Sequence, residues 1–423
     1  MTRSSPHPTQ RRNTHRTVLP NGLVVLVTEN PAADIVATRI LLQAGGRREP
    51  SNRAGVSGLL ASVLTKGTTQ RSSHEIAETV ESLGASLGAD AAADYSMIGA
   101  KTVSGDFPPI LALMAEILRS PTFPESEVAL EQRLAIQDVR SMQEQPFSVA
   151  YQQLQQALYG THPYATGTLG TEATLAQTSR KDILGYYQTH FHPDRSIISI
   201  AGRVDGAEAV ARVSDVLGDW PRSGFSLDDV PPVGDPTAHQ VVTHQETQQS
   251  VIMLGYLTPS VHHPDYAALK LISTYLGNGL SSRLFVELRE KRGLAYDVSA
   301  IYPTRLDASH FITYIGTAAQ NTAIAREGLE QEMHRLCDRM LTSDELQIAQ
   351  NKLLGQYALG KQTNSQISQL MGWYETLGLG IEFDQTFQQD CRAVTREQIQ
   401  QVAKRYFGNS PFVSLVGPKD ALT

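Results

Sequence analysis

Apolar positions along this chain recur with two different periods. Alternation with polar residues, or a short β-branched run, predicts a strand, and recurrence every three or four residues predicts a helix. Strands are predicted over residues 23–27, 35–42, 85–87, 95–103, 196–202, 250–256, within 294–316, and 412–417. Helices are predicted over residues 54–64, 73–82, 108–119, 125–143, 148–158, 180–190, 266–276, 284–292, 322–341, 343–361, 365–377 and 396–406. The elements come in blocks without strict alternation, which favours an α+β fold.

The order of elements occurs twice along the chain. Residues 185–202 and 402–417 both run from a helix through an aromatic exit and a turn into an apolar strand that ends in glycine. Residues 228–238 are rich in proline, aspartate and glycine and are predicted to be a linker. The repeat therefore predicts two homologous domains, 15–227 and 239–423, each a mainly antiparallel sheet with helices packed on one face.

The stretch Ser281–Val298 combines a predicted helix and strand with candidate chemistry. Gly293 stands where a left-handed helix cap is usual, and a reversal there brings Arg289 and Tyr296 to one side. A guanidinium and a tyrosine hydroxyl can hold a peptide carbonyl or stabilise an oxyanion, but neither is a good base at neutral pH. The alternative is that Arg289 pairs with a nearby acid such as Glu290 and that Tyr296 is an ordinary sheet residue.

Composition restricts the class of protein. With 423 residues the chain is too long for one ordinary core, and its net charge of −7 gives no reason to expect nucleic acid or an anionic membrane as partner. No apolar run is long enough to cross a bilayer. Residues 1–17 are basic and have no apolar core, so we expect a basic tail and no secretory signal. Cys337 and Cys391 provide neither a disulfide framework nor a thiolate metal cluster, which favours a cytoplasmic location.

From Val18 to Gly417 the chain resembles the pitrilysin/insulinase family of zinc peptidases, and specifically its two-domain processing-peptidase branch. In that family an arginine and a tyrosine spaced like Arg289 and Tyr296 hold the substrate. The resemblance therefore implies a catalytic, substrate-holding role for this pair. The segments that carry it are Gly45–Pro50, Thr65–Thr68, His162–Tyr164 and the stretch around Arg289 and Tyr296.

The same resemblance shows that the metal site is degenerate. The family carries H-x-x-E-H on a helix, where two histidines bind zinc and the glutamate activates water. Here the matching positions are Gly58, Ala61 and Ser62, and the third ligand matches Asp138. Glu131 matches a second family carboxylate and is expected to be a solvated helix residue. One aspartate cannot hold zinc, so we expect no metal and no other cofactor in this chain.

The resemblance thus implies a non-catalytic, substrate-binding subunit of a heterodimeric zinc metalloendopeptidase that encloses peptides in a chamber. Zinc is expected in a homologous partner subunit, and peptides are the expected substrate. The metal-free subunit of the mitochondrial processing peptidase has a long glycine-rich loop where this chain has only residues 277–280, so the bacterial two-gene type matches better. Two alternatives remain, a metal-free structural subunit of a larger complex and a peptide-binding module without catalysis.

Overall fold

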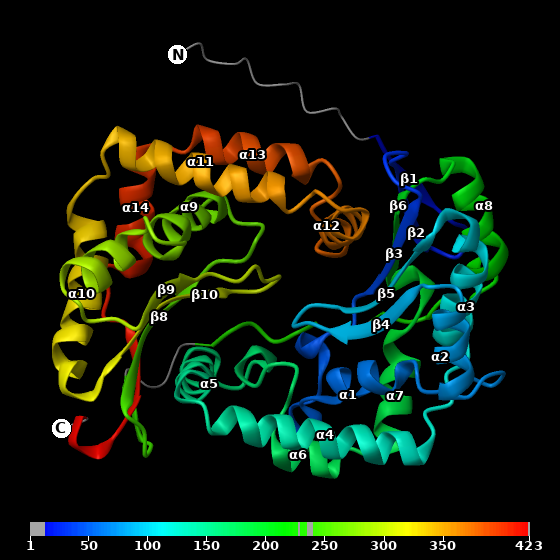
Figure 1. The fold of residues 1–423 in the computed structure, drawn as a ribbon, viewed down its shortest axis with the longest axis horizontal. Coiled ribbons are helices and arrows are strands. Elements are labelled where there is room, and N and C mark those ends of the chain that lie inside the picture. The colour runs from blue at the N-terminus through cyan, green and yellow to red at the C-terminus, as the bar shows by residue number, and fades with distance from the viewer. Residues whose placement is uncertain (1–12, 227–228, 235–239, 422–423) are drawn as a thin grey trace.

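The computed structural model describes residues 13–226, 229–234 and 240–421. Its strands form two separate sheets, which lie on opposite sides of the molecule in Figure 1. The first sheet has the order β1-β2-β6-β3-β5-β4, and only its β2–β6 pair is parallel. Its strands are β1 (Thr14–Val18), β2 (Val24–Glu29), β3 (Ile35–Leu42), β4 (Ser86–Ala91), β5 (Ser96–Val103) and β6 (Ser196–Gly202).

The second sheet repeats this arrangement with one strand fewer. Its order is β7-β11-β8-β10-β9, and only its β7–β11 pair is parallel. Strands β6 and β11 hold equivalent places, as the internal repeat predicts. The strands are β7 (Gln240–His244), β8 (Gln249–Thr258), β9 (Asp297–Ile301), β10 (Ser309–Ala318) and β11 (Phe412–Gly417). The predicted α+β class with two mainly antiparallel sheets is confirmed.

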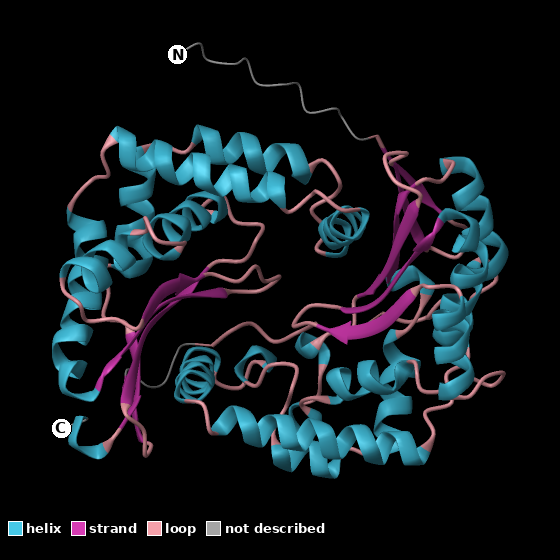
Figure 2. Cartoon of the chain, in the orientation of Figure 1, coloured by secondary structure: helices cyan, strands magenta, loops and turns pink. Residues whose placement is uncertain are grey.

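Helices surround both sheets, and the strands lie inside them (Figure 2). The first half contributes α1 (Val56–Leu64), α2 (Ser73–Ser82), α3 (Phe107–Arg119), α4 (Glu125–Gln143), α5 (Pro146–Tyr159), α6 (Glu172–Gln177), α7 (Arg180–His190) and α8 (Gly206–Leu217). The second contributes α9 (Tyr266–Gly277), the π-helical segment η6 (Phe285–Lys291), α10 (Thr322–Asp338), α11 (Ser343–Leu359), α12 (Asn364–Thr376), α13 (Phe383–Ala393) and α14 (Arg396–Phe407).

Two of these helices pack on the sheet of the opposite half. Helix α5 lies against β8 and β11, and α12 lies against β3 and β6. The contacts are apolar: Leu154 and Leu158 of α5 share a cluster with Met253, while Met371 of α12 shares one with Ile197. Because α5 follows α4 and α12 follows α11, the two helices are equivalent in the repeat. This reciprocal exchange fixes the two halves to each other.

Local signals set most of the predicted boundaries. Ser72 caps α2, since its hydroxyl accepts from the backbone N–H of Glu75 while the Glu75 carboxylate accepts from the Ser72 N–H. Helices α8 and α13 were not predicted, although apolar residues recur at helical spacing in both, as Ala209, Val213 and Leu217 do in α8. The strand after Gly293 begins at Asp297 instead of Leu294, which corrects the expected helix-to-strand change. Residues 1–12 of the expected basic tail and part of the linker lie outside the described residues, but the end of that tail belongs to strand β1, where Arg16 forms an ion pair with Glu375.

Candidate functional site

Helix α1, which carries the positions equivalent to the zinc motif, begins at a buried carboxylate. Glu49 accepts hydrogen bonds from the backbone N–H groups of Gly55 (2.7 Å) and Ser57 (2.8 Å) and from the Ser57 hydroxyl (2.5 Å). Unsatisfied N–H groups at a helix N-terminus favour an anion there. Burial nevertheless raises the pKa of Glu49 to about 7. The Gly45–Pro50 motif therefore has a structural role, because its Glu49 carboxyl group accepts hydrogen bonds from the N–H groups at the start of α1.

The first zinc-motif position has no room for a side chain. A Cβ atom placed on Gly58 would lie 2.6 Å from the backbone oxygen of Thr168, in the loop that follows η4 (Pro163–Ala165). Such a distance is well inside van der Waals contact, and a backbone atom cannot move aside as a flexible side chain can. Ala61 is buried, and the Ser62 hydroxyl donates to the Leu59 oxygen at 2.9 Å. The volume where a first histidine would stand is therefore occupied by protein.

The two carboxylates expected near this site lie on α4, which packs against α1. Glu131 was expected to be a solvated helix residue. It instead forms an ion pair with Lys66 (2.9 Å), and its side chain is only 14% exposed. Asp138 lies two turns further along the helix and is exposed. No group of three or more histidine, cysteine, aspartate or glutamate side chains within the described residues is arranged to hold a metal ion. The residues present do not fit zinc.

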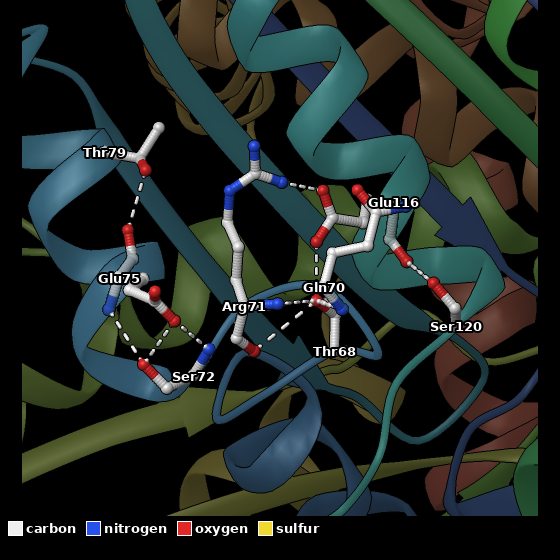
Figure 3. Close-up of polar contacts among 8 residues, drawn as sticks. All are labelled: Thr68, Gln70, Arg71, Ser72, Glu75, Thr79, Glu116 and Ser120. Carbon is white, nitrogen blue, oxygen red and sulfur yellow. Dashed lines mark hydrogen bonds and ion pairs between the residues drawn. The ribbon is translucent and has the colours of Figure 1, made fainter.

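The Thr65–Thr68 motif, which follows α1, anchors the turn that leads to α2 (Figure 3). Thr68 donates to the Glu116 carboxylate of α3 at 2.5 Å, and its hydroxyl oxygen accepts from the backbone N–H of Arg71 at 2.9 Å. The Arg71 guanidinium forms an ion pair with the same carboxylate. This motif holds α1, α2 and α3 together and supplies no chemistry of its own.

The structure brings the Arg289 side chain into contact with the backbone of Tyr296. Arg289, on η6, donates a hydrogen bond from Nη1 to the Tyr296 backbone oxygen at 2.7 Å, and its guanidinium lies 5.0 Å from the centre of the Phe285 ring. Gly293 has a φ of 63°, as expected for a left-handed cap. The Tyr296 side chain is 57% exposed. The alternative pairing of Arg289 with Glu290 is not among the ion pairs of the described residues.

The segment between the two residues is fixed from both ends. The Leu294 N–H donates to the Leu288 oxygen (2.8 Å), and the Tyr296 N–H donates to the Gly316 oxygen of β10 (2.8 Å). The Thr317 hydroxyl donates to the Leu294 oxygen (2.6 Å). Because these bonds hold the backbone, an exposed guanidinium and an exposed phenol are presented from a defined surface. Such a pair can donate hydrogen bonds to a carbonyl oxygen.

A buried polar cluster that the sequence did not predict joins the two halves. Arg47 of the Gly45–Pro50 motif forms an ion pair with Asp307, and His162 of the His162–Tyr164 motif lies 3.3 Å from the same carboxylate. Although burial opposes the shift, the hydrogen bonds from Arg47 and the nearby His162 ring lower the pKa of Asp307 to about 2. Tyr164 donates to Asp94. These motif residues therefore fix the junction between the halves, and only the folded chain shows their common purpose.

A second part of this cluster surrounds His310. The Tyr151 and Tyr159 hydroxyls of α5 lie 3.0 and 2.9 Å from its two ring nitrogens. Burial, with the charge of Arg305 as a smaller cause, lowers the pKa of His310 to about 3, so the ring is neutral at physiological pH. The helix exchanged between the halves is thus held by hydrogen bonds as well as by apolar contacts.

Among the described residues, none of the helices is both long and apolar enough to cross a membrane. Cys337 and Cys391 are free and buried, in agreement with the absence of a disulfide framework.

Comparisons with known proteins agree on one family. Residues 24–172 match the family model "Insulinase (Peptidase family M16)", and residues 177–353 match "Peptidase M16 inactive domain". A curated relative from Bacillus subtilis, named an uncharacterized zinc protease, is 27% identical over 94% of this chain and 97% of its own length. One from Rickettsia felis with the same description is 25% identical over 97% of this chain and 99% of its own length.

Solved structures share the fold. A peptidase M16 inactive domain from Pseudomonas fluorescens superposes with a TM-score of 0.89 at 24% identity, covering 96% of this chain and 98% of its own. A protease from Helicobacter pylori superposes with a TM-score of 0.87 at 21% identity, covering 96% of this chain and 99% of its own. At these identities the likeness concerns the fold alone.

Proposed function

The chain belongs to the insulinase family of M16 peptidases, and from this premise we propose that it is the non-catalytic, substrate-binding subunit of a heterodimeric zinc metalloendopeptidase. In this proposal a homologous subunit carries zinc, and the two chains together enclose the peptide that is degraded or processed.

One observation carries the proposal: the metal half of the family site is filled, while the substrate-holding half is exposed. A side chain at position 58 would collide with the Thr168 backbone oxygen. Arg289 and Tyr296 meanwhile lie together on a fixed segment, with the tyrosine 57% exposed. A chain that binds zinc by itself would need an open space at position 58. A purely structural subunit would not need an exposed arginine and tyrosine on a fixed segment.

The chemistry assigned to this chain is limited to holding the substrate. The Arg289 guanidinium is bonded to the Tyr296 backbone oxygen through Nη1, and no other hydrogen bond of its side chain is formed within the described residues. Its remaining donors and the Tyr296 hydroxyl would bond to the carbonyl oxygen of the scissile peptide. They would hold that oxygen more strongly as negative charge develops on it. Activation of water is left to the partner, because neither group is a base at neutral pH.

The names of the curated relatives suggest another activity. The Bacillus subtilis relative is named a zinc protease, but positions 58, 61 and 62 of this chain offer no zinc ligand. Peptidase activity by this chain alone is therefore not proposed. A cytoplasmic location is proposed with the function, and the buried free thiols of Cys337 and Cys391 support it.

The test is co-purification of the tagged full-length chain from its native cell, with identification of the bound protein by mass spectrometry. We expect a homologous chain that carries H-x-x-E-H, and we expect peptidase activity only when the two are mixed. A stable complex without such a chain would favour the structural alternative. Peptide binding by a protein that recruits no partner would favour the binding module.

A further inference from the structure

A cavity of about 160 Å³ lies beside η6. The residues that line it have no part in the proposed function. It is walled by α9, by the loop before η6, by η6 itself and by α11. Ser281 and Ile348 line it and are exposed, so the cavity is open to solvent. A cavity of about 150 Å³ is large enough to hold a benzene molecule. There is therefore room for a compact organic group and not only for water.

Two buried hydrogen-bond donors on the cavity lack a hydrogen-bond acceptor within the described part of the chain, and a partly exposed lysine lies beside them. The Ser282 side chain is buried, with 2% of the residue exposed, and its hydroxyl has no partner. Arg283 donates from Nε to Glu332 at 2.8 Å, and its buried Nη2 forms an ion pair with Glu287 at 3.4 Å but no hydrogen bond. Lys352 forms no ion pair with any described residue. A buried donor without an acceptor is costly, so this wall favours a group rich in acceptors.

The acids on the same cavity already have partners. Glu345 accepts from the Thr342 N–H at 2.8 Å and from the Tyr275 hydroxyl at 3.0 Å. Glu287 accepts from Lys291 at 2.8 Å and forms an ion pair with Arg283 at 3.4 Å. The hydrogen-bonding capacity left over is therefore that of donors, two of them cationic. Burial lowers the pKa of Lys352, a shift that a bound anion would oppose.

The remaining wall is apolar and small, with Val286 on η6 and Ile348 and Ala349 on α11. We propose that this cavity binds a carboxylate that carries a compact branched apolar group. The carboxylate lies against Ser282, Arg283 and Lys352, and the branched group lies against the apolar wall. Two sources share this chemistry, the C-terminal residue of a peptide ending in leucine or valine, and a free branched-chain acid. The site does not depend on the proposed pairing with a zinc-bearing chain.

The test is calorimetric titration of the isolated full-length protein with N-acetyl-L-leucine and with N-acetyl-L-leucinamide, which differ only in the charge of the terminal group. We expect the acid to bind and the amide to bind at least about tenfold more weakly, because it loses charge-assisted hydrogen bonds. Lys352→Met should weaken binding of the acid by about tenfold for the same reason. Lys404→Met, an exposed position on α14, is the matched control and should bind as the parent does.

Isovalerate separates the two sources. Binding as tight as that of N-acetyl-L-leucine identifies a free-acid site, and much weaker binding identifies a site for a peptide C-terminus. Ser282→Ala and Ala349→Leu, with melting curves to show that each is folded, test the polar and apolar walls independently. Equal binding of acid and amide, no loss in Lys352→Met, or no heat with any of the three compounds would overturn the proposal.

Discussion

The two halves of this molecule differ at the positions that the resemblance to zinc peptidases singles out, although these positions lie on elements that are not equivalent in the repeat. In the first half, α1 is built from small and aliphatic residues, begins at a buried carboxylate and is covered at Gly58 by the backbone of another loop. In the second half, η6 ends at a left-handed glycine and presents Arg289 and Tyr296 on an exposed segment. One surface is closed by packing and the other is open but held in place.

The difference shows how closely the first half is packed at the positions where zinc ligands would stand. The Thr168 backbone occupies the space beside Gly58, and Lys66 forms an ion pair with the Glu131 carboxylate. Because interiors are packed densely, larger side chains cannot be added there without displacing these groups. Arg289 and Tyr296, by contrast, are exposed.

The largest effect is expected from an attempt to reopen the closed surface. Gly58→His, Ala61→Glu and Ser62→His together should yield a poorly folded protein without stoichiometric zinc. Overpacking costs about 1–3 kcal/mol for each misfit, and the Thr168 backbone must move. Thermal melting and elemental analysis are the measurements. A triple variant that melts like the parent and binds one zinc tightly would show that the space is available.

A single-atom version of this experiment has an internal control. Gly58→Ala should destabilise the protein by about 1–3 kcal/mol, although alanine is the better helix former. Gly185→Ala, in α7 and with no atom within 4 Å of the added Cβ, should instead stabilise it by about 0.5–1 kcal/mol. Equal effects at the two positions would contradict the collision at Gly58.

The open surface is tested by rate and not by stability. In the complex reconstituted with a zinc-bearing partner, Arg289→Ala and Tyr296→Phe should each reduce kcat by about a hundredfold, the usual cost of losing one oxyanion donor. Both side chains are exposed, so melting temperature and complex formation should stay close to those of the parent. Full activity in both variants would remove the role assigned to the pair.

A smaller effect, with a defined dependence on pH, is expected where the halves join. His310→Asn should destabilise the protein by about 1–3 kcal/mol at pH 7, because the Tyr151 hydroxyl loses its partner and the Tyr159 hydroxyl keeps only the Ala308 oxygen. The pKa of His310 is about 3 in the folded protein, against an ordinary value of 6.5. The unfolded chain therefore binds a proton between these values, and the parent loses stability as the pH falls through this window.

The variant lacks this contribution. The difference in the free energy of unfolding between parent and variant should therefore become smaller as the pH falls from 6.5 towards 3. Denaturant unfolding at several pH values measures it, and the comparison cancels other titrating groups. A gap that stays constant would mean that His310 is not held neutral by the fold.

The smallest effect concerns the carboxylate that a metal site would have used. Glu131→Gln should cost at most about 1 kcal/mol, since it removes one partly exposed ion pair with Lys66. Lys66→Met should cost a similar amount, and the double variant should cost less than the sum of the two. Chemical denaturation of the four proteins gives the coupling. Additive costs would show that the pair does not interact in solution.

The sequence alone determined the features that depend on neighbouring residues. The limits of β3, β6, β11, α4 and α7 follow from local periodicity and capping, as with Ser179, which caps α7 by the same reciprocal bonds as Ser72 caps α2. The lack of zinc ligands at positions 58, 61 and 62 can be read directly from the residues. The contact of the Arg289 guanidinium with the Tyr296 backbone oxygen lies across the single glycine turn that connects them, and the joint role of the two side chains stays a prediction.

Only the tertiary structure decided the features that join distant segments. No local pattern predicts that Thr168 fills the space beside Gly58, that Lys66 pairs with Glu131, or that Arg47 and His162 share Asp307. The exchange of α5 and α12 between the sheets belongs to the same class. An apolar helix face indicates that the helix is buried, but it does not indicate which segment covers that face. These contacts depend on how surfaces from distant parts of the chain fit together. Local secondary-structure propensity does not encode that fit.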